Sequence, residues 1–485
     1  MSNHQGVSRW ASSLRTVARS ACRLAKKLLA VIGLKRYRTA SSTAESDVEA
    51  PKRSATNSPS PQGTFVTQLD TADFSVVYQR FAAVIGEATW VDHIQKVNAA
   101  IKGCPTLQQF LRGENEIPYA LSFIAEGLKQ HGAIAVPMDQ ATTLLPAISF
   151  AAQALSMIDL YGPVEGERFR CRVADALTNA DSMRGLRLEM MVVTHFQRRG
   201  HRPEWPEHIG AGTFDLLFPE YGPLGLEVEC KAVSDDKGRS VHIEEALRFI
   251  NLLLERKVYD GVPDCVGVSL TLSNRMPTSI GQRAALADAV RRCIEARAGE
   301  VLSDGTEIKV SVFDSAELAA LDRTSRDSVR GFIQRLTGTD NRQGILVYSQ
   351  QGGAVAFAVQ SAKDDTVLKT IFDTLKDASK RQLTKTRPGV LVAGLYGLSD
   401  AELRSVADQD HDPSQAPTEL AVHVSQFLRN ANRQHLVGAS FVSRGVLMPR
   451  VDGNVDSGGA AYNFINDKSP MWDEAFRGMF SPDAD

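Results

Sequence analysis

The fold of this chain is decided by the stretch Phe214-Asp215-Leu216-Leu217-Phe218 and the stretch Gly225-Leu226-Glu227-Val228-Glu229-Cys230-Lys231. Between the two apolar segments lies the sequence Pro219-Glu220-Tyr221-Gly222-Pro223, which is rich in turn-forming residues. Two short apolar strands around such a turn predict a β-hairpin. The hairpin would place an aspartate beside a Glu-x-Lys sequence.

The second strand of the hairpin sorts its side chains by face. Side chains alternate along a strand, so Leu224, Leu226, Val228 and Cys230 share one face. Glu227, Glu229 and Lys231 share the other face. In the ordinary interpretation these three charges form the solvent-facing side of an amphipathic strand.

The same charges also suit a chemical role. Mg²⁺ prefers oxygen ligands, typically one or two carboxylates together with water and substrate, and Asp215 and Glu229 supply two carboxylates. A lysine beside them, Lys231, would remain charged and would hold or polarise an attacking water. Glu227 is the reserve ligand if the strand register is shifted.

This pattern resembles the PD-(D/E)xK nuclease superfamily, in which an Asp and a Glu-x-Lys lie on adjacent strands of a restriction-endonuclease-like fold. The resemblance covers residues 165–275, and Phe214 stands where the name-giving pattern has proline. It implies that Asp215 and Glu229 bind Mg²⁺, with Mn²⁺ able to substitute. It also implies that Lys231 is the catalytic lysine.

A helix is predicted before the hairpin, between Met183 and Gly200, from apolar residues at helical spacing. Glu189 lies on its apolar flank, where an acid is costly unless it is paired or metal-bound. Many members of the superfamily carry a glutamate on this helix, so Glu189 is a third candidate ligand and catalytic residue. The alternatives are a salt bridge with Arg187 or an exposed position. On the helix expected after Lys231, the candidates for phosphate contact are His242, Glu245 and Arg248.

Length and composition set the broad class. The chain has 485 residues, 43% hydrophobic and 23% charged, which is enough for two or three domains with a large core. Its six cysteines include no Cys-x-x-Cys pair, which argues against a zinc site and a disulfide framework. We therefore expect a cytoplasmic protein, with peripheral membrane contact as an option.

The N-terminal arm, residues 1–38, carries nine Lys or Arg residues and no acid. Its apolar residues recur in steps of three or four, so a helix here would be amphipathic and basic. Four interpretations remain open: contact with an anionic membrane through residues 9–38, nucleic-acid binding, organelle targeting, or an unpacked tail. No apolar run is long enough to cross a bilayer.

The remaining pattern predicts an α/β protein with a restriction-endonuclease-like mixed sheet flanked by helices. The predicted parts after the arm are a flexible linker (39–64), a helical domain (65–163), the PD-(D/E)xK-like core (164–400) and a C-terminal α/β extension (401–485). Strands are expected at 266–272, 308–313, 345–348, 355–359 and 389–392, and helices at 280–296 and 366–383. We expect these strands to extend the sheet of the catalytic hairpin.

The expected function is metal-dependent phosphodiester hydrolysis, in DNA more than in RNA, with defence against foreign DNA as a setting that the resemblance implies. Cutting both strands of a duplex would favour a homodimer. The alternative is a catalytically inactive binding or scaffold protein with the same fold, anchored to a membrane by its basic N-terminal helix. No phosphate-binding Gly-Lys-Ser/Thr loop is present, which argues against an ATP-driven motor.

Overall fold

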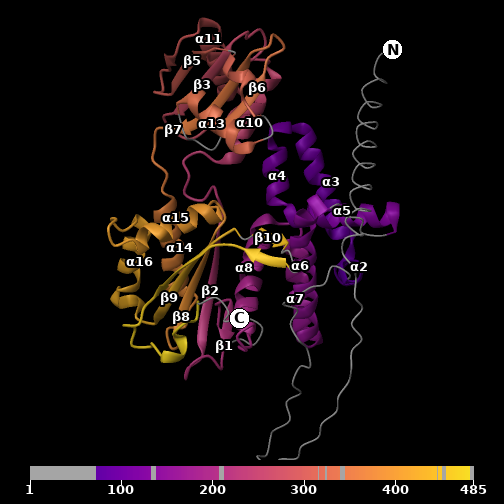
Figure 1. Cartoon of the computed structure of the whole chain (residues 1–485), viewed down its shortest axis with the longest axis vertical. Helices are drawn as coiled ribbons and strands as arrows, with labels where there is room; N and C mark the ends of the chain where they lie inside the picture. The colour runs from indigo at the N-terminus through magenta and orange to yellow at the C-terminus, as the bar shows by residue number, and fades with distance from the viewer. Residues whose placement is uncertain are drawn as a thin grey trace, which may run out of the picture. The chain divides into compact units, whose positions relative to one another are not determined.

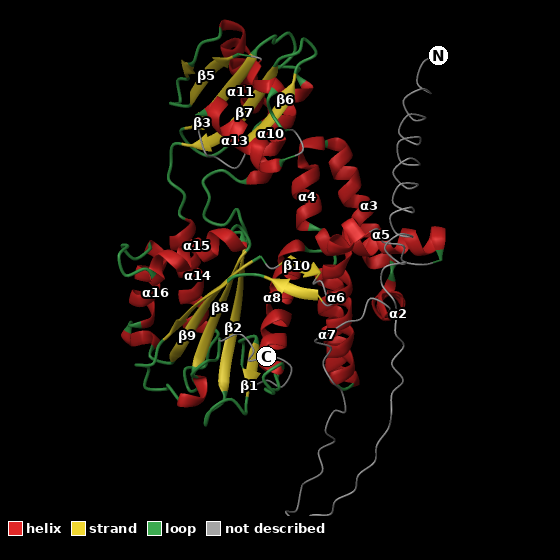
Figure 2. Cartoon of the chain, viewed as in Figure 1, coloured by secondary structure: helices red, strands yellow, loops and turns green. Residues whose placement is uncertain are grey.

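The computed structural model describes residues 73–132, 138–206, 212–314, 316–322, 325–338, 344–444, 446–449 and 455–480. Within them the chain is an α/β protein with two five-stranded mixed sheets and a two-stranded ribbon (Figures 1 and 2). The ribbon pairs β10 (Val446–Pro449) with β11 (Val455–Gly458). The predicted basic arm and linker, residues 1–38 and 39–64, lie outside the described residues.

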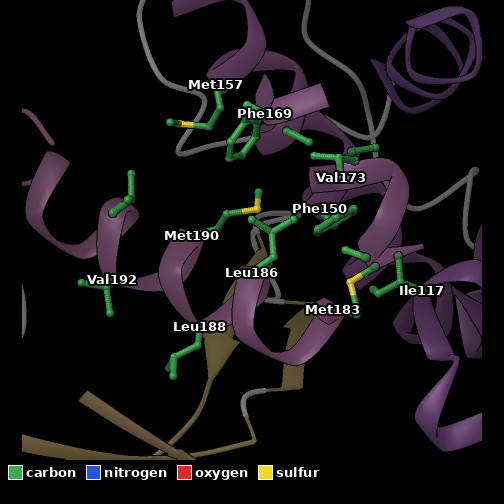
Figure 3. Packing of buried hydrophobic residues seen from close by; sticks show 14 of the residues in the cluster. Ile117, Phe150, Met157, Phe169, Val173, Met183, Leu186, Leu188, Met190 and Val192 are labelled. Carbon is green, nitrogen blue, oxygen red and sulfur yellow. The ribbon is translucent and has the colours of Figure 1, made fainter. Parts of the chain in front are cut away.

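A run of helices precedes the first sheet: α2 (Phe74–Phe81), α3 (Ala88–Gly103), α4 (Gln108–Glu114), α5 (Glu116–His131), α6 (Met138–Leu160), α7 (Pro163–Ala176) and α8 (Ala180–Gln197). The predicted helical pattern is thus confirmed in the described residues from 74 to 160. Asn179 caps the N-terminus of helix α8, because its side chain accepts hydrogen bonds from the amides of Asp181 and Ser182. Figure 3 shows Leu186 and Met190 of α8 turned toward Phe169 of α7 in one apolar core.

The first sheet has the strand order β1-β2-β8-β9-β12. Its strands are β1 (Leu216–Phe218), β2 (Leu226–Val233), β8 (Gly389–Leu395), β9 (Leu436–Ser443) and β12 (Ala461–Ile465). The predicted hairpin is confirmed: β1 and β2 are antiparallel, with Leu216 opposite Val228. Strands β2, β8 and β9 are parallel neighbours, so the domain boundary predicted between residues 400 and 401 falls inside one sheet.

Helices cover both faces of this sheet. On one face α8 packs against Val228 and Val390 in the core shared with the N-terminal helices. The other face packs against α14 (Val367–Arg381) and α16 (Glu419–Leu428) in a second apolar core, and α15 (Asp400–His411) contributes Leu403 to it. Strand β2 is therefore an interior strand with two covered faces.

This burial corrects one expectation. In the ordinary interpretation of the sequence, Glu227 and Glu229 lie on the solvent-facing side of an amphipathic strand, but both have 0% exposure. The alternation itself is as predicted. The difference arises because β8, more than 150 residues away in sequence, pairs with β2 and brings α14 over the charged face.

The second sheet has the order β4-β5-β3-β7-β6. It is built from β3 (Cys265–Leu272), β4 (Glu300–Val301), β5 (Glu307–Phe313), β6 (Gly344–Tyr348) and β7 (Ala354–Ser361). Its apolar cores involve α10 (Ile243–Glu255) and α11 (Ile280–Ala296) on one side, and α12 (Ala316–Ala319) and α13 (Arg326–Thr337) on the other. The predicted strands and the helix at 280–296 are confirmed, but the expectation that these strands extend the hairpin's sheet is wrong.

The segment that carries the second sheet is inserted between β2 and α14, and its two ends meet. Thr366 N donates to Gly238 O at 2.7 Å, and Arg239 Nη1 lies 2.9 Å from Asp365 Oδ2. Ser240 N also donates to Asp365, at 2.9 Å. The chain therefore leaves and re-enters the first sheet at one point, which keeps β2 and β8 adjacent despite the long insertion.

None of the helices in the described part of the chain combines the length and the hydrophobicity needed to cross a membrane.

Candidate active site

Asp215 and Glu229 are tied together at the end of the β1–β2 hairpin. Asp215 directly precedes β1, and its Oδ2 accepts a hydrogen bond from Cys230 N at 2.7 Å. In return, Asp215 N donates to Glu229 Oε2 at 3.2 Å. The carboxylate of Asp215 thus binds the backbone of β2, and the carboxylate of Glu229 binds the backbone just before β1. These two hydrogen bonds extend the contact between the two chain segments beyond the paired residues Leu216 and Val228. The expected juxtaposition of the two acids is present.

Lys231 lies two residues beyond Glu229 on the same face of β2, and its Nζ forms an ion pair with Glu229 Oε1. The Lys231 side chain is 25% exposed, whereas Glu229 is fully buried. Burial alone would lower the pKa of Lys231, but the charge of Glu229 outweighs it and raises that pKa above its ordinary value. The ammonium group is therefore charged at neutral pH.

Glu189 projects from α8 and is only 6% exposed. Its two carboxylate oxygens each lie 2.8 Å from Nη2 of Arg172 on α7. The alternative partner considered from the sequence, Arg187, instead lies 4.0 Å from Glu116. The cost of placing Glu189 on an apolar flank is thus offset by an arginine from the preceding helix.

The three acids lie in one electrostatic environment. Burial and then the charge of Asp215 raise the pKa of Glu229 to about 8, against the lowering effect of Lys231. Burial likewise raises the pKa of Glu189 to about 7, against the charge of Arg172 and with a contribution from Asp215. The pKa of the Cys230 thiol is raised by burial and then by the charges of Asp215, Glu189 and Glu229. A cation would relieve this accumulation of negative charge.

The oxygen donors of Asp215 and Glu229 suit Mg²⁺, which commonly takes one or two carboxylates and completes its shell with water and substrate. Among the residues that the structure describes, no group of three or more His, Cys, Asp or Glu side chains is arranged to hold a metal ion. The fit is therefore to a two-carboxylate site. Glu189 would join it only by leaving Arg172.

Glu227, the reserve ligand, has a different set of contacts. Its carboxylate accepts hydrogen bonds from Thr384 N at 2.9 Å and from Thr384 Oγ1, and Arg387 Nη1 lies 3.8 Å away. The register is not shifted, because Glu227 lies opposite Leu217. Glu227 therefore fixes the loop that precedes β8, while Glu229 lies beside Asp215.

The candidate phosphate contacts on the helix after β2 are placed elsewhere. Helix α10 packs into the core of the second sheet through Ala246, Phe249 and Ile250. Arg248 pairs with Glu244 on the helix surface at 2.7 Å. The helix that covers the charged face of β2 is α14, which follows the inserted segment and lies more than 100 residues after the helix expected from the sequence.

Sequence reasoning missed Arg172 and Thr384. Arg172 is one of three arginines within five residues of α7, and nothing in the local pattern distinguishes it from Arg168 and Arg170. Thr384 lies in an ordinary polar loop. Both are recognisable only from the three-dimensional contacts that they make with buried glutamates.

Comparisons of this chain with protein-family models, with curated proteins and with solved structures found no match.

The raised pKa values predict how the stability of the metal-free protein depends on pH. Unfolded glutamates release their protons near pH 4.3, whereas folded Glu189 and Glu229 retain theirs to about pH 7 and 8. Between these limits the native state binds more protons than the unfolded state, so the free energy of unfolding falls as pH rises. We expect a contribution on the order of 1 kcal/mol per pH unit, measured by urea denaturation in EDTA between pH 5.5 and 8.

The control is Glu189→Gln/Glu229→Gln, in which these two titrations are removed. Its stability should vary less with pH over the same range. An identical slope in the variant and the wild-type protein would contradict the assignment of raised pKa values to these two carboxyls.

Proposed function

We propose that this chain is a metal-dependent nuclease that hydrolyses phosphodiester bonds, with DNA favoured over RNA. The observation that carries the proposal is the convergence of Asp215, Glu229 and Lys231 on the β1–β2 hairpin. Two carboxylates and a charged lysine at one point are the groups that cation-assisted attack on a phosphate requires. The preference for DNA and the setting of defence against foreign DNA rest on the resemblance to PD-(D/E)xK nucleases.

Asp215 and Glu229 would hold Mg²⁺, or Mn²⁺ in its place. The cation would neutralise charge on the phosphate and lower the pKa of water. Both carboxyls must be ionised to bind it, and the raised pKa of Glu229 means that metal binding displaces a proton from that group. The Mg²⁺ concentration needed for half-maximal cleavage should therefore rise as the pH falls below about 8.

Lys231 would act as a cation and not as a general base. Its raised pKa keeps the proton on Nζ, so the group donates hydrogen bonds to an attacking water or to a phosphate oxygen. Its partial exposure, in contrast to the buried Glu229, leaves the ammonium accessible to a substrate. Charge stabilisation at a developing oxyanion is the role that this geometry supports.

Glu189 would support the site from α8. Its carboxylate is held by Arg172, and its charge contributes to the environment of Asp215. In this role Glu189 and Arg172 set the electrostatic field at the two ligands. Direct coordination by Glu189 requires a change of partner from Arg172 to the cation.

The experiment that tests the proposal is a cleavage assay of the purified full chain on plasmid, linear duplex, single-stranded DNA and RNA, in Mg²⁺, Mn²⁺ or EDTA. We expect cutting in either cation and none in EDTA. Which of the four substrates is cut identifies the class. The absence of cutting under all conditions, with a folded protein, would contradict the proposal.

One observation favours a second candidate, a catalytically inactive binding protein. Glu229 and Glu189 already have cationic partners within the chain, Lys231 and Arg172, as in a structural ion-pair arrangement. In that case, addition of increasing Mg²⁺ should leave the melting temperature of the protein unchanged. The predicted arm at residues 1–38 would then provide contact with a membrane. Loss of liposome co-sedimentation on deletion of residues 1–38 would support that role.

A further inference from the structure

A cationic segment joins the end of α14 to β8. Between residues 376 and 388 five residues are basic and one, Asp377, is acidic. Lys380, Arg381 and Lys385 are exposed, and Arg387 is partly so. No described carboxylate forms an ion pair with the first three, and the nearest partner of Arg387 is the buried Glu227, at 3.8 Å. The exposed side chains of Lys380, Arg381 and Lys385 therefore present positive charge that no described carboxylate pairs with.

The segment is fixed to both strands of the candidate site. Thr384 binds the carboxylate of Glu227, which lies two residues before Glu229 on the same face of β2, or about 7 Å along the strand. Thr213 Oγ1, two residues before Asp215, donates to Gln382 O at 3.3 Å. These contacts hold the cationic segment within a few nucleotide lengths of Asp215, Glu229 and Lys231.

Lys385 adopts an unusual backbone conformation, with φ of +66°. This left-handed region is unfavourable for a residue other than glycine, and glycine or asparagine would occupy it more readily. The lysine is exposed and packs into no core. This conformation directs attention to the Lys385 charge, which the variants below test directly.

Another cation, Arg433, comes from a different part of the chain and lies in the turn that leads to the strand beside the start of β8. The turn that ends at Arg433 leads into β9, and Gly389 N donates to His435 O at 2.8 Å beside the start of β8. Arg433 lies over the Phe427 ring at 4.1 Å from its centre. Burial lowers the pKa of His435, and the charges of Lys385 and Arg433 lower it further, so each of these cations acts on His435 beside the start of β8.

We propose that Lys380, Arg381, Lys385, Arg387 and Arg433 form a phosphate-binding surface that holds the backbone of a nucleic acid and guides the strand across the site. This inference rests on the proposed function and adds which residues bind the substrate. The apolar side chains of the segment, Leu383 and Pro388, are buried, so the surface offers nothing to insert into a membrane. A hydrated polyanion is the partner that these charges fit.

The test compares two triple variants of the full chain that lose the same charge. The first, Lys380→Gln/Arg381→Gln/Lys385→Gly, removes cations of this surface and relieves the strain at residue 385. The control, Arg275→Gln/Lys309→Gln/Arg330→Gln, removes three exposed cations from the second-sheet segment. Binding of a fluorescein-labelled duplex and of its single strand is measured in EDTA at several salt concentrations, with melting temperatures in parallel.

We expect the first variant to bind nucleic acid more weakly. The negative slope of log association constant against log salt concentration should become shallower by about 2 to 3, because each phosphate contact contributes about 0.7 to 0.9. The control should retain the wild-type slope. If the wild-type protein binds and cuts nucleic acid but the first variant keeps the wild-type slope, the assignment of this phosphate-binding surface is wrong. The proposed function would then still stand. A wild-type protein that neither binds nor cuts would overturn both.

Discussion

Replacement of Lys231 by glutamine is expected to lower the rate of Mg²⁺-dependent cleavage by about 10²- to 10⁴-fold. Glutamine retains a hydrogen-bond donor near Glu229 but removes the positive charge from the site. The loss should appear in the turnover rate at saturating substrate, because the charge acts on the reacting phosphate more than on ground-state binding. Single-turnover cleavage of the preferred substrate measures this rate.

Lys237→Gln is the matched control, because Lys237 lies in the loop that follows β2 and carries the same charge. Its rate should stay within a few-fold of the wild-type rate, roughly the effect of a peripheral charge. Lys237→Gln should melt like the wild-type protein, whereas Lys231→Gln takes the cationic partner from the buried Glu229 and should melt at a lower temperature, so the rates are compared where both variants are folded. Equal rates for Lys231→Gln and the wild-type protein would remove the lysine from the mechanism.

The largest stability effect is expected from Arg172→Met. This change leaves Glu189, which is 6% exposed, without its cationic partner. Breaking a buried ion pair from one side costs about 3 to 5 kcal/mol, and the 29% exposure of the Arg172 side chain places this pair toward about 2 to 4 kcal/mol. The loss should be greater at pH 8 than at pH 6, because Glu189 can take up a proton at the lower pH.

Two further variants separate the buried pair from a general effect on α7. Arg172→Met/Glu189→Met replaces both charges by apolar side chains and should recover most of the lost stability. Arg170→Met, which breaks an exposed pair with Glu167 on the same helix, should have little effect on stability. Equal losses for Arg170→Met and Arg172→Met in urea denaturation would contradict the account of Glu189.

Much of the local structure near the site could be predicted from the sequence. Alternation of apolar and charged residues around a Pro- and Gly-rich turn predicted the β1–β2 hairpin and the two faces of β2, and helical spacing predicted α8. These are local signals, because each depends on residues less than about 20 positions apart. The juxtaposition of Asp215 with Glu229 follows directly from the hairpin.

The surroundings of the site depend on distant pairings that no local pattern reveals. Strand β8, which pairs with β2, follows the second-sheet segment in the sequence. This distant pairing buries Glu229 and places the loop before β8 against Glu227. The alternating pattern of β3, β5 and β7 predicted strands correctly but could not state which sheet they join. The role of Arg172 could likewise not be predicted from the sequence. Only the packing of α7 against α8 shows that this arginine, and not a neighbouring one, pairs with Glu189.

Glu227 and Glu229 offer the most direct test of the central claim, because they are chemically identical, fully buried and two residues apart on the same face of β2. The measurement is single-turnover cleavage by Glu229→Gln and Glu227→Gln in Mg²⁺, with the melting temperature of each variant. We predict that Glu229→Gln abolishes cleavage while the protein stays folded, and that Glu227→Gln still cuts at saturating substrate. Cleavage that persists in Glu229→Gln, or an equal loss in both folded variants, would contradict the assignment of the site to Asp215, Glu229 and Lys231.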